Sequence, residues 1–203
     1  MLRITQSESP EAAKKYFGQS LRRGDYYLEG QEVAGSWGGK AAKMLGLDGP
    51  VTEKVFGKML ENIRPDGNRL TLRTVENRRP GYDFTFDVPK SVSLMNALGG
   101  DKRIEAAARR AMEETMVEIE AEMHTRVRIG GAQNDRQTGN MVWADFTHFT
   151  SRPAPVDDDT AARLKDIVIR GDKGEALMPD PHFHFHVYVL NATYDAEEGR
   201  FKA

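Results

Sequence analysis

The stretch that decides the fold is Asp180-Pro-His-Phe-His-Phe-His-Val-Tyr-Val-Leu190. Successive side chains of a β-strand point to opposite faces, so this alternation predicts a strand over 182–191. The Phe and Val side chains of one face predict packing in the core. The other face carries His182, His184 and His186, spaced about 6.6 Å apart along the strand, and continues with a Tyr and a Leu.

This row of imidazoles indicates a metal site. Two histidines at positions i and i+2 of a strand can bind one cation if a neighbouring strand supplies a third ligand. His148 is the candidate, because it ends the apolar face of a second predicted strand, 140–149. Three nitrogen ligands would leave positions open for an oxygen ligand, as catalytic metals need. The alternatives are a hydrated polar sheet face and, for His148, a core histidine.

Tyrosines supply a candidate nucleophile. Tyr16 lies on the first predicted helix, and Tyr26 and Tyr27 follow it. A tyrosine is usually a packing residue, and a phenol with a pKa near 10 needs a base or a cation to attack. A three-histidine metal ion would polarise a phosphate oxygen and stabilise the transition state, so that a weak nucleophile suffices.

A carboxylate is expected beside these groups. Asp83 shares one face of the predicted strand 82–87 with Thr85 and Asp87. A carboxylate next to a ligating histidine accepts its second N–H and fixes the tautomer. Asp83 could instead take the phenolic proton or simply face solvent. His124 is expected to end a long helix, where it would interact with the helix dipole.

Composition narrows the class of protein. The chain has 203 residues, 39% of them hydrophobic, and a net charge of −2. This predicts one domain with a real core and excludes a polycation that binds nucleic acid by charge alone. The absence of cysteine excludes disulfides, thiolate zinc sites and Cys nucleophiles. Without a run of 18 apolar residues or an apolar leader, a cytoplasmic protein with no membrane span is expected.

The remaining pattern predicts an α+β two-layer sandwich with a mainly antiparallel sheet. The expected elements are an edge strand 1–6; a helix capped by Ser9 with Pro10 at its first position, ending near Arg23; short helices within 36–62 around Trp37, Leu45 and Phe56; a long helix from Asp101 to about His124; an antiparallel pair formed by 127–129 and 140–149, with 130–139 as its turn; and a surface insertion, 153–179, holding one short helix near 161–169.

Short motifs in a fixed order then resemble the N-terminal domain of F-plasmid-type conjugative relaxase-helicases, the MobF class of HUH endonucleases. The matching pieces are Tyr16 with Tyr26-Tyr27; Ser36-Trp-Gly-Gly-Lys-Ala-Ala42 with Leu45-Gly-Leu47; Gly81-Tyr-Asp-Phe-Thr-Phe86 running into Pro89-Lys-Ser-Val-Ser93; Thr138-Gly-Asn140; His148 with Thr150-Ser-Arg152; and Asp180-Pro181 leading to His184-Phe-His186. Only 153–179 falls outside the resemblance.

The resemblance implies a sequence-specific endonuclease and strand transferase that nicks one strand at a plasmid transfer origin. A tyrosine attacks the scissile phosphodiester, leaving a 5′-phosphotyrosyl link and a free 3′-hydroxyl, and ester exchange makes the step reversible without ATP. The DNA would be the single strand or hairpin of the origin. Relaxosome accessory proteins and a type IV secretion coupling protein would be the protein partners.

The resemblance also assigns roles to residues. It implies that Tyr16 cleaves first and that Tyr26 serves the second transfer, with Tyr27 left open for that role. The implied metal ligands are His148, His184 and His186, oriented by Asp83, and Lys90, Arg152 and Tyr27 would contact DNA. The metal would be Mg or Mn in function, whereas Zn, Ni or Co would bind more tightly.

This sequence departs from the family pattern at three points, which leaves alternative assignments of its site and function open. Phe17 replaces a tyrosine of the family's first pair, and His182 adds a second His-x-His frame, 182/184. The family domain continues beyond Ala203, often into a helicase, so we expect a C-terminally truncated domain. A non-catalytic single-stranded DNA-binding remnant is the main alternative. A cupin-type oxygenase or hydrolase is disfavoured, because Leu190 stands where a ligating Glu would be needed.

Overall fold

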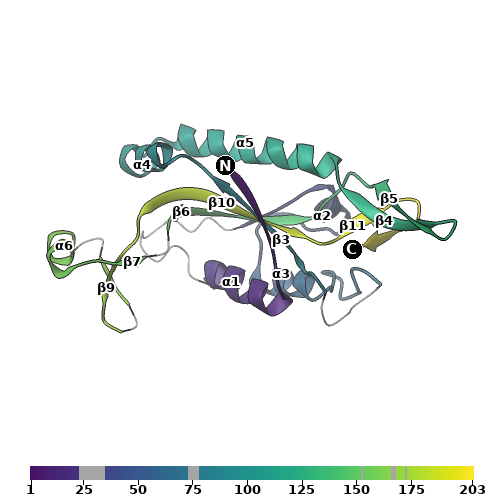
Figure 1. Ribbon diagram of the computed structural model, residues 1–203, viewed down its shortest axis with the longest axis horizontal. Helices are drawn as coiled ribbons and strands as arrows, with labels where there is room; N and C mark the ends of the chain where they lie inside the picture. Colours follow the sequence, from purple (N-terminus) through teal and green to yellow (C-terminus); the bar gives the residue numbers. More distant parts are fainter. Residues whose placement is uncertain (23–34, 73–77, 152, 166–167, 172) are drawn as a thin grey trace.

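The centre of the molecule, a computed structural model, is a five-stranded sheet with the order β1-β3-β10-β6-β2, in which all neighbours are antiparallel (Figure 1). The structure describes residues 1–22, 35–72, 78–151, 153–165, 168–171 and 173–203. The sheet strands are β1 (Leu2–Gln6), β2 (Ser36–Gly38), β3 (Gly81–Asp87), β6 (Trp143–Thr150) and β10 (Pro181–Leu190). The histidine strand β10 is therefore central, between β3 and β6.

Helices cover both faces of this sheet. Figure 1 shows α4 and α5 above it and α1 and α3 below it. The helices are α1 (Pro10–Arg22), α2 (Lys40–Met44), α3 (Glu53–Leu60), α4 (Lys90–Gly99), α5 (Lys102–Ala121) and α6 (Asp158–Arg163). The mixed α/β fold with an antiparallel sheet is confirmed. The structure adds a second helical layer to the predicted sandwich, because β10 is apolar on both faces beyond His186.

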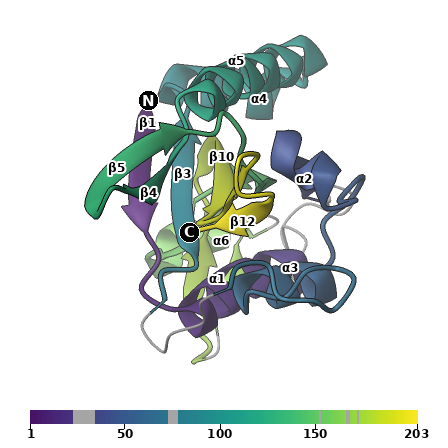
Figure 2. The same cartoon turned by 90° about the vertical axis from the view of Figure 1, so that its right-hand side faces the viewer.

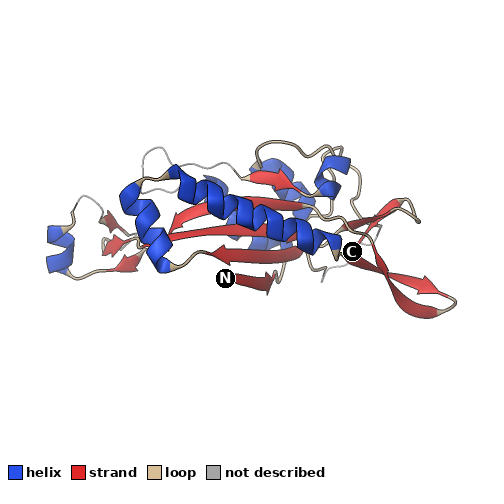
Figure 3. Ribbon diagram, turned by 90° about the horizontal axis from the view of Figure 1, so that it is seen from above, coloured by secondary structure: helices blue, strands red, loops and turns tan. Residues whose placement is uncertain are grey.

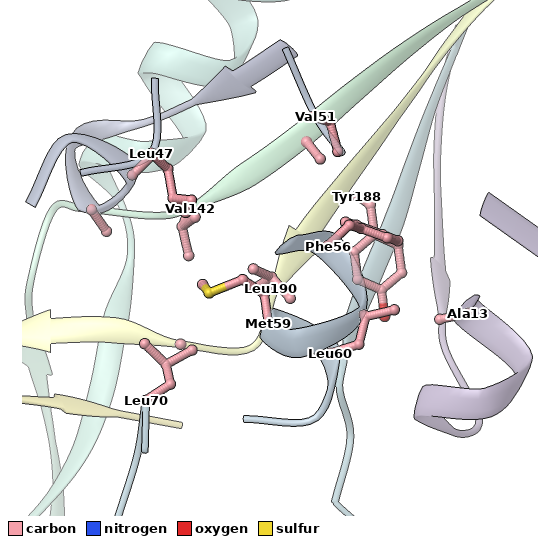
Figure 4. Packing of buried hydrophobic residues seen from close by; sticks show 14 of the residues in the cluster. Ala13, Leu47, Val51, Phe56, Met59, Leu60, Leu70, Val142, Tyr188 and Leu190 are labelled. Atoms are coloured by element: carbon pink, nitrogen blue, oxygen red, sulfur yellow. The ribbon is translucent and has the colours of Figure 1, made fainter. Parts of the chain in front are cut away.

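The core below the sheet fixes α1 in place. Tyr188 and Leu190 of β10 are fully buried there, beside Phe56 of α3 (Figure 4). Phe17 of α1 is 2% exposed, and its ring centroid lies 5.0 Å from that of Tyr188 and 5.2 Å from that of Phe146. Burying an aromatic side chain of this size contributes about 2 kcal/mol or more. Phe17 thus anchors the helix that carries the neighbouring Tyr16.

The core above the sheet is the predicted Phe/Val face of β10. Met112 and Met116 of α5 pack onto it, both at most 2% exposed. The buried β10 side chains on this face are Phe183, Phe185, Val187 and Val189. The predicted Asp101 cap is confirmed, since its side chain accepts a hydrogen bond from Arg103 N at 3.0 Å. Likewise Ser9 Oγ accepts from Ala12 N at the start of α1.

The predicted pairing of 127–129 with 140–149 is wrong. β4 (His124–Ile129) pairs instead with β5 (Ala132–Gln137), within the segment predicted as a turn. Gly130 and Gly131 both have positive φ, 58° and 87°, and this conformation makes a two-residue hairpin turn. Strand β6 is consequently free to pair with β10. In Figure 2 the hairpin lies near β12 and the C-terminal end of the described chain.

Two other expectations are corrected. Trp37 lies in the short strand β2, which pairs with β6, and not in a helix. Of the two helices of this region, α2 ends just before Leu45 and α3 contains Phe56. The long helix ends at Ala121, and His124 is the first residue of β4. The His124 ring lies with Nδ1 2.6 Å from the carbonyl oxygen of Glu122, so it stabilises the turn after the helix. The predicted helix end near Arg23 lies outside the described residues.

The described residues of the range 153–179 form an arm at one end of the sheet, opposite the β4–β5 hairpin (Figure 3). Its helix, α6, begins earlier than predicted, because Asp157 caps it by accepting from Thr160 N at 2.8 Å. The arm also contains a small antiparallel sheet of the order β7-β9-β8. Its strands are β7 (Ala154–Pro155), β8 (Ile169–Arg170) and β9 (Ala176–Met178), and the remaining strands of the chain are β11 (Thr193–Asp195) and β12 (Arg200–Lys202).

Candidate active site

Sheet pairing brings the three predicted metal ligands together. His184 of β10 stands directly opposite His148 of β6 in the strand register. The ring centroid of His148 lies 5.2 Å from that of His184 and 5.2 Å from that of His186, and the last two are 5.0 Å apart. His184 and His186 are 8% and 6% exposed. The prediction that His148 lies beside the His-x-His strand is confirmed.

The predicted carboxylate and the predicted nucleophile lie on opposite sides of one of these rings. His186 Nδ1–H donates to the Asp83 carboxylate, at 2.8 Å from Oδ2 and 3.0 Å from Oδ1. This bond leaves Nε2 as an acceptor, and Nε2 lies 3.2 Å from the hydroxyl oxygen of Tyr16. The phenol of the first helix therefore reaches the histidine cluster, with 37% of Tyr16 exposed to solvent.

The electrostatics of the cluster favour the neutral form of His148 and His184. Burial, assisted by the neighbouring His186 and His184, lowers the pKa of His148 to about 3. Burial also lowers the pKa of His184 to about 4, against the hydrogen bond that its Nδ1–H donates to the carbonyl of His182 at 2.8 Å. A neutral imidazole offers its free nitrogen lone pair, which is the form that binds metal ions.

The donor set fits a borderline divalent ion, although the rings are not aimed at one point. Nitrogen ligands with a carboxylate behind one of them are typical of Zn, Ni or Co sites. Within the described part of the chain, however, no three His, Asp or Glu side chains are oriented around a common ion position. An ion held by His148, His184 and His186 would require these rings to turn and the Tyr16 hydroxyl to leave Nε2.

The other predicted site residues either lie outside the histidine cluster or are not described by the structure. Lys90, a predicted DNA contact, forms an ion pair with Asp180 and donates to the carbonyl of Pro181 at 2.7 Å. This leaves a DNA contact of Lys90 as a prediction. Tyr26, Tyr27 and Arg152 lie outside the described residues.

One hydrogen-bonded pair, His182 with Asp87, is not predicted from the sequence. His182 Nε2–H donates to Oδ1 of Asp87 at 3.1 Å, at the end of β3. The sequence pattern places Asp87 on the same strand face as Asp83 but predicts no function for it. The available signal was the i, i+4 spacing of two aspartates on one strand face beside a strand of alternating histidines.

No helix among the described residues has the length and apolar character needed to span a membrane.

Comparison with known proteins supports the resemblance. The family model of the TrwC relaxase matches residues 10–203. The chain is 37% identical over 182 residues to the multifunctional conjugation protein TraI of Escherichia coli strain K12. The aligned region covers 89% of this chain and 10% of that protein. A second Escherichia coli TraI is 36% identical over 195 residues, covering 95% of this chain. The chain thus spans about a tenth of the length of these curated relatives.

Solved structures of TrwC have the same fold. The metal-bound conjugative relaxase TrwC in complex with oriT DNA superposes with a TM-score of 0.74 at 31% identity, covering all of this chain and 61% of that one. The copper-bound complex gives 0.75 at 30% identity, with 61% of that chain covered. TrwC with a 27-mer DNA comprising the recognition hairpin and the cleavage site gives 0.71 at 29% identity, with 59% covered. By its sequence and its fold, the chain belongs to the TrwC relaxase family.

Proposed function

We propose that this domain nicks one DNA strand at a plasmid origin of transfer and rejoins strands there, through a covalent 5′-phosphotyrosyl intermediate. One observation carries the proposal: the Tyr16 hydroxyl lies 3.2 Å from His186 Nε2, beside two further imidazoles and with Asp83 behind the ring. A phenol aimed at a carboxylate-oriented imidazole is arranged for nucleophilic attack. This arrangement favours the enzyme over a DNA-binding remnant of the same fold.

The chemistry is an exchange of esters. The Tyr16 oxygen would attack the scissile phosphorus, the bond from phosphorus to the 3′-oxygen would break, and the 3′-oxygen would leave as a hydroxyl after gaining a proton. Asp83 holds His186 with Nε2 as acceptor, so the phenolic proton faces a lone pair. Without a metal ion on Nε2, this nitrogen would take the phenolic proton, and the carboxylate would stabilise the charge on the ring. With an ion bound to Nε2, the phenol would leave this nitrogen and its proton would pass to water.

A divalent metal ion is part of the proposal. His148, His184 and His186 would hold it, and it would supply charge stabilisation to the phosphate oxygens in the transition state. We propose Mg or Mn in function, with tighter binding of Zn, Ni or Co to the nitrogen ligands. The published metal-bound and copper-bound forms of TrwC support an ion in relatives of this chain.

The remaining assignments extend from the relatives. We propose Tyr26 as the nucleophile of the second transfer, with Tyr27 as its alternative and as a DNA contact together with Lys90 and Arg152. The DNA would be the single-stranded and hairpin region of the origin, as in the TrwC complexes. Relaxosome accessory proteins and a type IV secretion coupling protein would complete the machinery, in the cytoplasm.

Tyr16→Phe tests the proposal. The protein is incubated with Mn²⁺ and a single-stranded oligonucleotide that carries the hairpin and cleavage site of a transfer origin, and covalent adducts are separated on a denaturing gel. We expect the wild type to form an adduct and Tyr16→Phe to form none, while both retain the DNA in a binding assay. Tyr82→Phe is the matched control, because Tyr82 packs on the α5 side of the sheet. An undiminished adduct in Tyr16→Phe would reassign the first cleavage to Tyr26.

A further inference from the structure

An apolar groove lies at one border of the sheet, between β1 and the second half of α5. Figure 2 shows β1 as the outermost strand on its side of the sheet and α5 above the sheet. The groove has a volume of about 570 Å³, and its apolar lining includes Ile4 of β1, Tyr82 and Phe84 of β3, Ile119 of α5 and Met123. Ile4 is 54% exposed. An exposed apolar surface of this kind marks a site of interaction.

The backbone of β1 has a free edge beside this groove. In the sheet order β1 stands at the end and pairs with β3 alone. Met1 and Ser7, which flank β1, both form backbone hydrogen bonds with β3. Because the residues of an antiparallel strand bond alternately to one side and the other, Leu2, Ile4 and Gln6 direct their N–H and C=O groups away from β3. Within the described part of the chain, no backbone group bonds to this edge.

The same residues that present the free edge also face the groove. Leu2, Ile4 and Gln6 share one face of β1, and Ile4 stands opposite Phe84, which lies in the core under α5. In an antiparallel pair, residues that bond to each other have their side chains on the same face. An antiparallel strand added to β1 would therefore place the side chains of its edge-bonded residues over the groove. This combines main-chain hydrogen bonds with pockets for alternate side chains, as in strand addition by peptides.

The rim of the groove is acidic. Glu118 and Glu122 line it, and together with Glu114 they form a row at i, i+4 spacing on one side of α5, all exposed. Like charges at this spacing destabilise a helix by a few tenths of a kcal/mol. Neither Glu118 nor Glu122 has a side-chain hydrogen bond or an ion pair with a described residue. Lysine or arginine side chains of a partner would complement this rim.

The charge of the rim also decides between occupants. The phosphate backbone of DNA would be repelled by the glutamates. A second copy paired through β1 about a twofold axis would bring its own Glu118 and Glu122 to the same rim, so like charges would face each other. An extended protein segment with basic residues meets neither obstacle.

We propose that the groove and the free edge of β1 form a docking site for an extended segment of a partner protein. The segment adds to β1 as an antiparallel strand, like every other neighbour in this sheet. Its side chains are apolar at alternate positions, which enter the groove, and Lys or Arg residues flank them and face Glu118 and Glu122. This inference goes beyond the proposed function, since it uses neither Tyr16 nor the histidines.

Peptide binding measured by fluorescence anisotropy tests the proposal. The probe is a labelled peptide, Lys-Lys-Val-Thr-Ile-Thr-Val-Lys-Lys, and two forms of it are the matched controls. In an antiparallel arrangement the amides of its Val and Ile residues face β1, so N-methylation of these three amides should weaken binding at least about tenfold. N-methylation of the two Thr amides, which face away, should change the affinity by less than about threefold.

Two further measurements locate the peptide on the protein. Hydrogen exchange followed by NMR should slow at least about tenfold for the amides of Ile4 and Gln6 when the peptide is bound. The double variant Glu118→Gln/Glu122→Gln should bind the peptide at least about threefold more weakly, with a smaller dependence on salt. Glu11→Gln/Glu175→Gln carries the same change of charge away from the groove, and its affinity should equal that of the wild type.

The proposal is overturned if the wild type shows no saturable binding up to about 1 mM peptide. It is also overturned if methylation of the Val and Ile amides has no effect, or if the peptide binds without slowing exchange at Ile4 and Gln6. Slow exchange of these two amides in the absence of peptide, with a dimer in sedimentation velocity, would assign the edge to a second copy instead. None of these results changes the DNA adduct of the wild type, so the proposed function is tested separately.

Discussion

At the scale of single residues, the site is built around the two nitrogens of His186. The Asp83 carboxylate accepts a hydrogen bond from Nδ1–H, and the Tyr16 hydroxyl lies on the lone pair of Nε2. A metal ion and the phenol therefore compete for the same atom. The rings of His182 and His184 stack on each other farther along β10, with centroids 4.4 Å apart.

The histidines also predict how stability depends on pH. In the metal-free protein, burial holds the pKa of His148 near 3 and that of His184 near 4, below the value of about 6.5 expected in the unfolded chain. Between pH 6.5 and 4 the unfolded state thus binds more protons than the folded state. The stabilising contribution is complete above pH 6.5 and is lost as the pH falls, by at most about 1.4 kcal/mol per pH unit for each group.

Thermal unfolding followed by circular dichroism in EDTA measures this effect. We expect the Tm of the wild type to fall between pH 6.5 and 5, where most carboxylates stay charged, and the Tm of His148→Gln to fall less steeply. His124→Gln should follow the wild type, since His124 lies outside the cluster. Parallel curves for wild type and His148→Gln would show that His148 is not held neutral by burial.

At the scale of elements, two glycines let β2 and α2 pack against the start of β6. A Cβ on Gly38 would lie 2.3 Å from the indole nitrogen of Trp143, and one on Gly39 would lie 2.2 Å from the carbonyl oxygen of Met141. Gly39 also has φ at 94°, a conformation that other residues rarely adopt. The Ser-Trp-Gly-Gly-Lys motif is therefore a packing motif as well as a family signature.

Gly39→Ala should accordingly destabilise the fold. We expect its free energy of unfolding to fall by about 2 kcal/mol or more, from backbone strain together with the contact to Met141. Urea unfolding measures the change. Gly99→Ala is the matched control, because a Cβ there meets no atom within 4 Å and Gly99 lies in α4; its stability should be unchanged or raised by up to about 1 kcal/mol. Equal losses in the two variants would contradict the packing argument.

Elements with strong local signals could be predicted from the sequence. The alternation of β10 and the caps of α1 and α5 are local, and the structure confirms all three. Strand pairing could not be predicted in the same way, because it depends on which edges meet in space. The Gly130-Gly131 turn directs β4 to β5, so β6 pairs with β10 and not with β4.

In the candidate site, too, the local features could be predicted from the sequence, whereas the contacts between strands could not. The face shared by the histidines follows from a period of two, and so does the face that carries Asp83 and Asp87. Which carboxylate meets which imidazole depends on the register of β3 against β10, where Tyr188 stands opposite Asp83 and His184 opposite Asp87. The sequence does not determine this register, so the pairing of Asp83 with a histidine could be predicted but that of Asp87 with His182 could not.

At the scale of the whole molecule, the arm at 153–179 stands apart from the rest. The strands on either side of it are direct neighbours, with Pro181 opposite Thr150 in the register. Ser151 N donates to the carbonyl of Asp180 at 2.9 Å, which closes the base of the arm. Among the described residues of the arm, only Ala176 is buried. The arm therefore adds little to the core, in agreement with its prediction as a surface insertion.

Removing the arm should leave the fold and the metal site intact. We expect a variant in which Asn-Gly joins Arg152 to Asp180, so that the proposed DNA contact Arg152 is kept, to unfold cooperatively. Its free energy of unfolding should lie within about 1 kcal/mol of the wild type, because a short turn with Asn-Gly suits an antiparallel pair and a shorter loop costs less entropy to close. Its Ni²⁺ affinity should also be unchanged. The full-length variant Asp158→Asn/Asp159→Asn, which neutralises part of the acidic run, separates the effect of charge from that of length. If the shortened protein loses cooperative unfolding, the arm is part of the folding unit. The shortened protein could instead keep its fold and its Ni²⁺ binding but lose the DNA adduct. If the charge variant retains that adduct, the arm positions DNA at Tyr16.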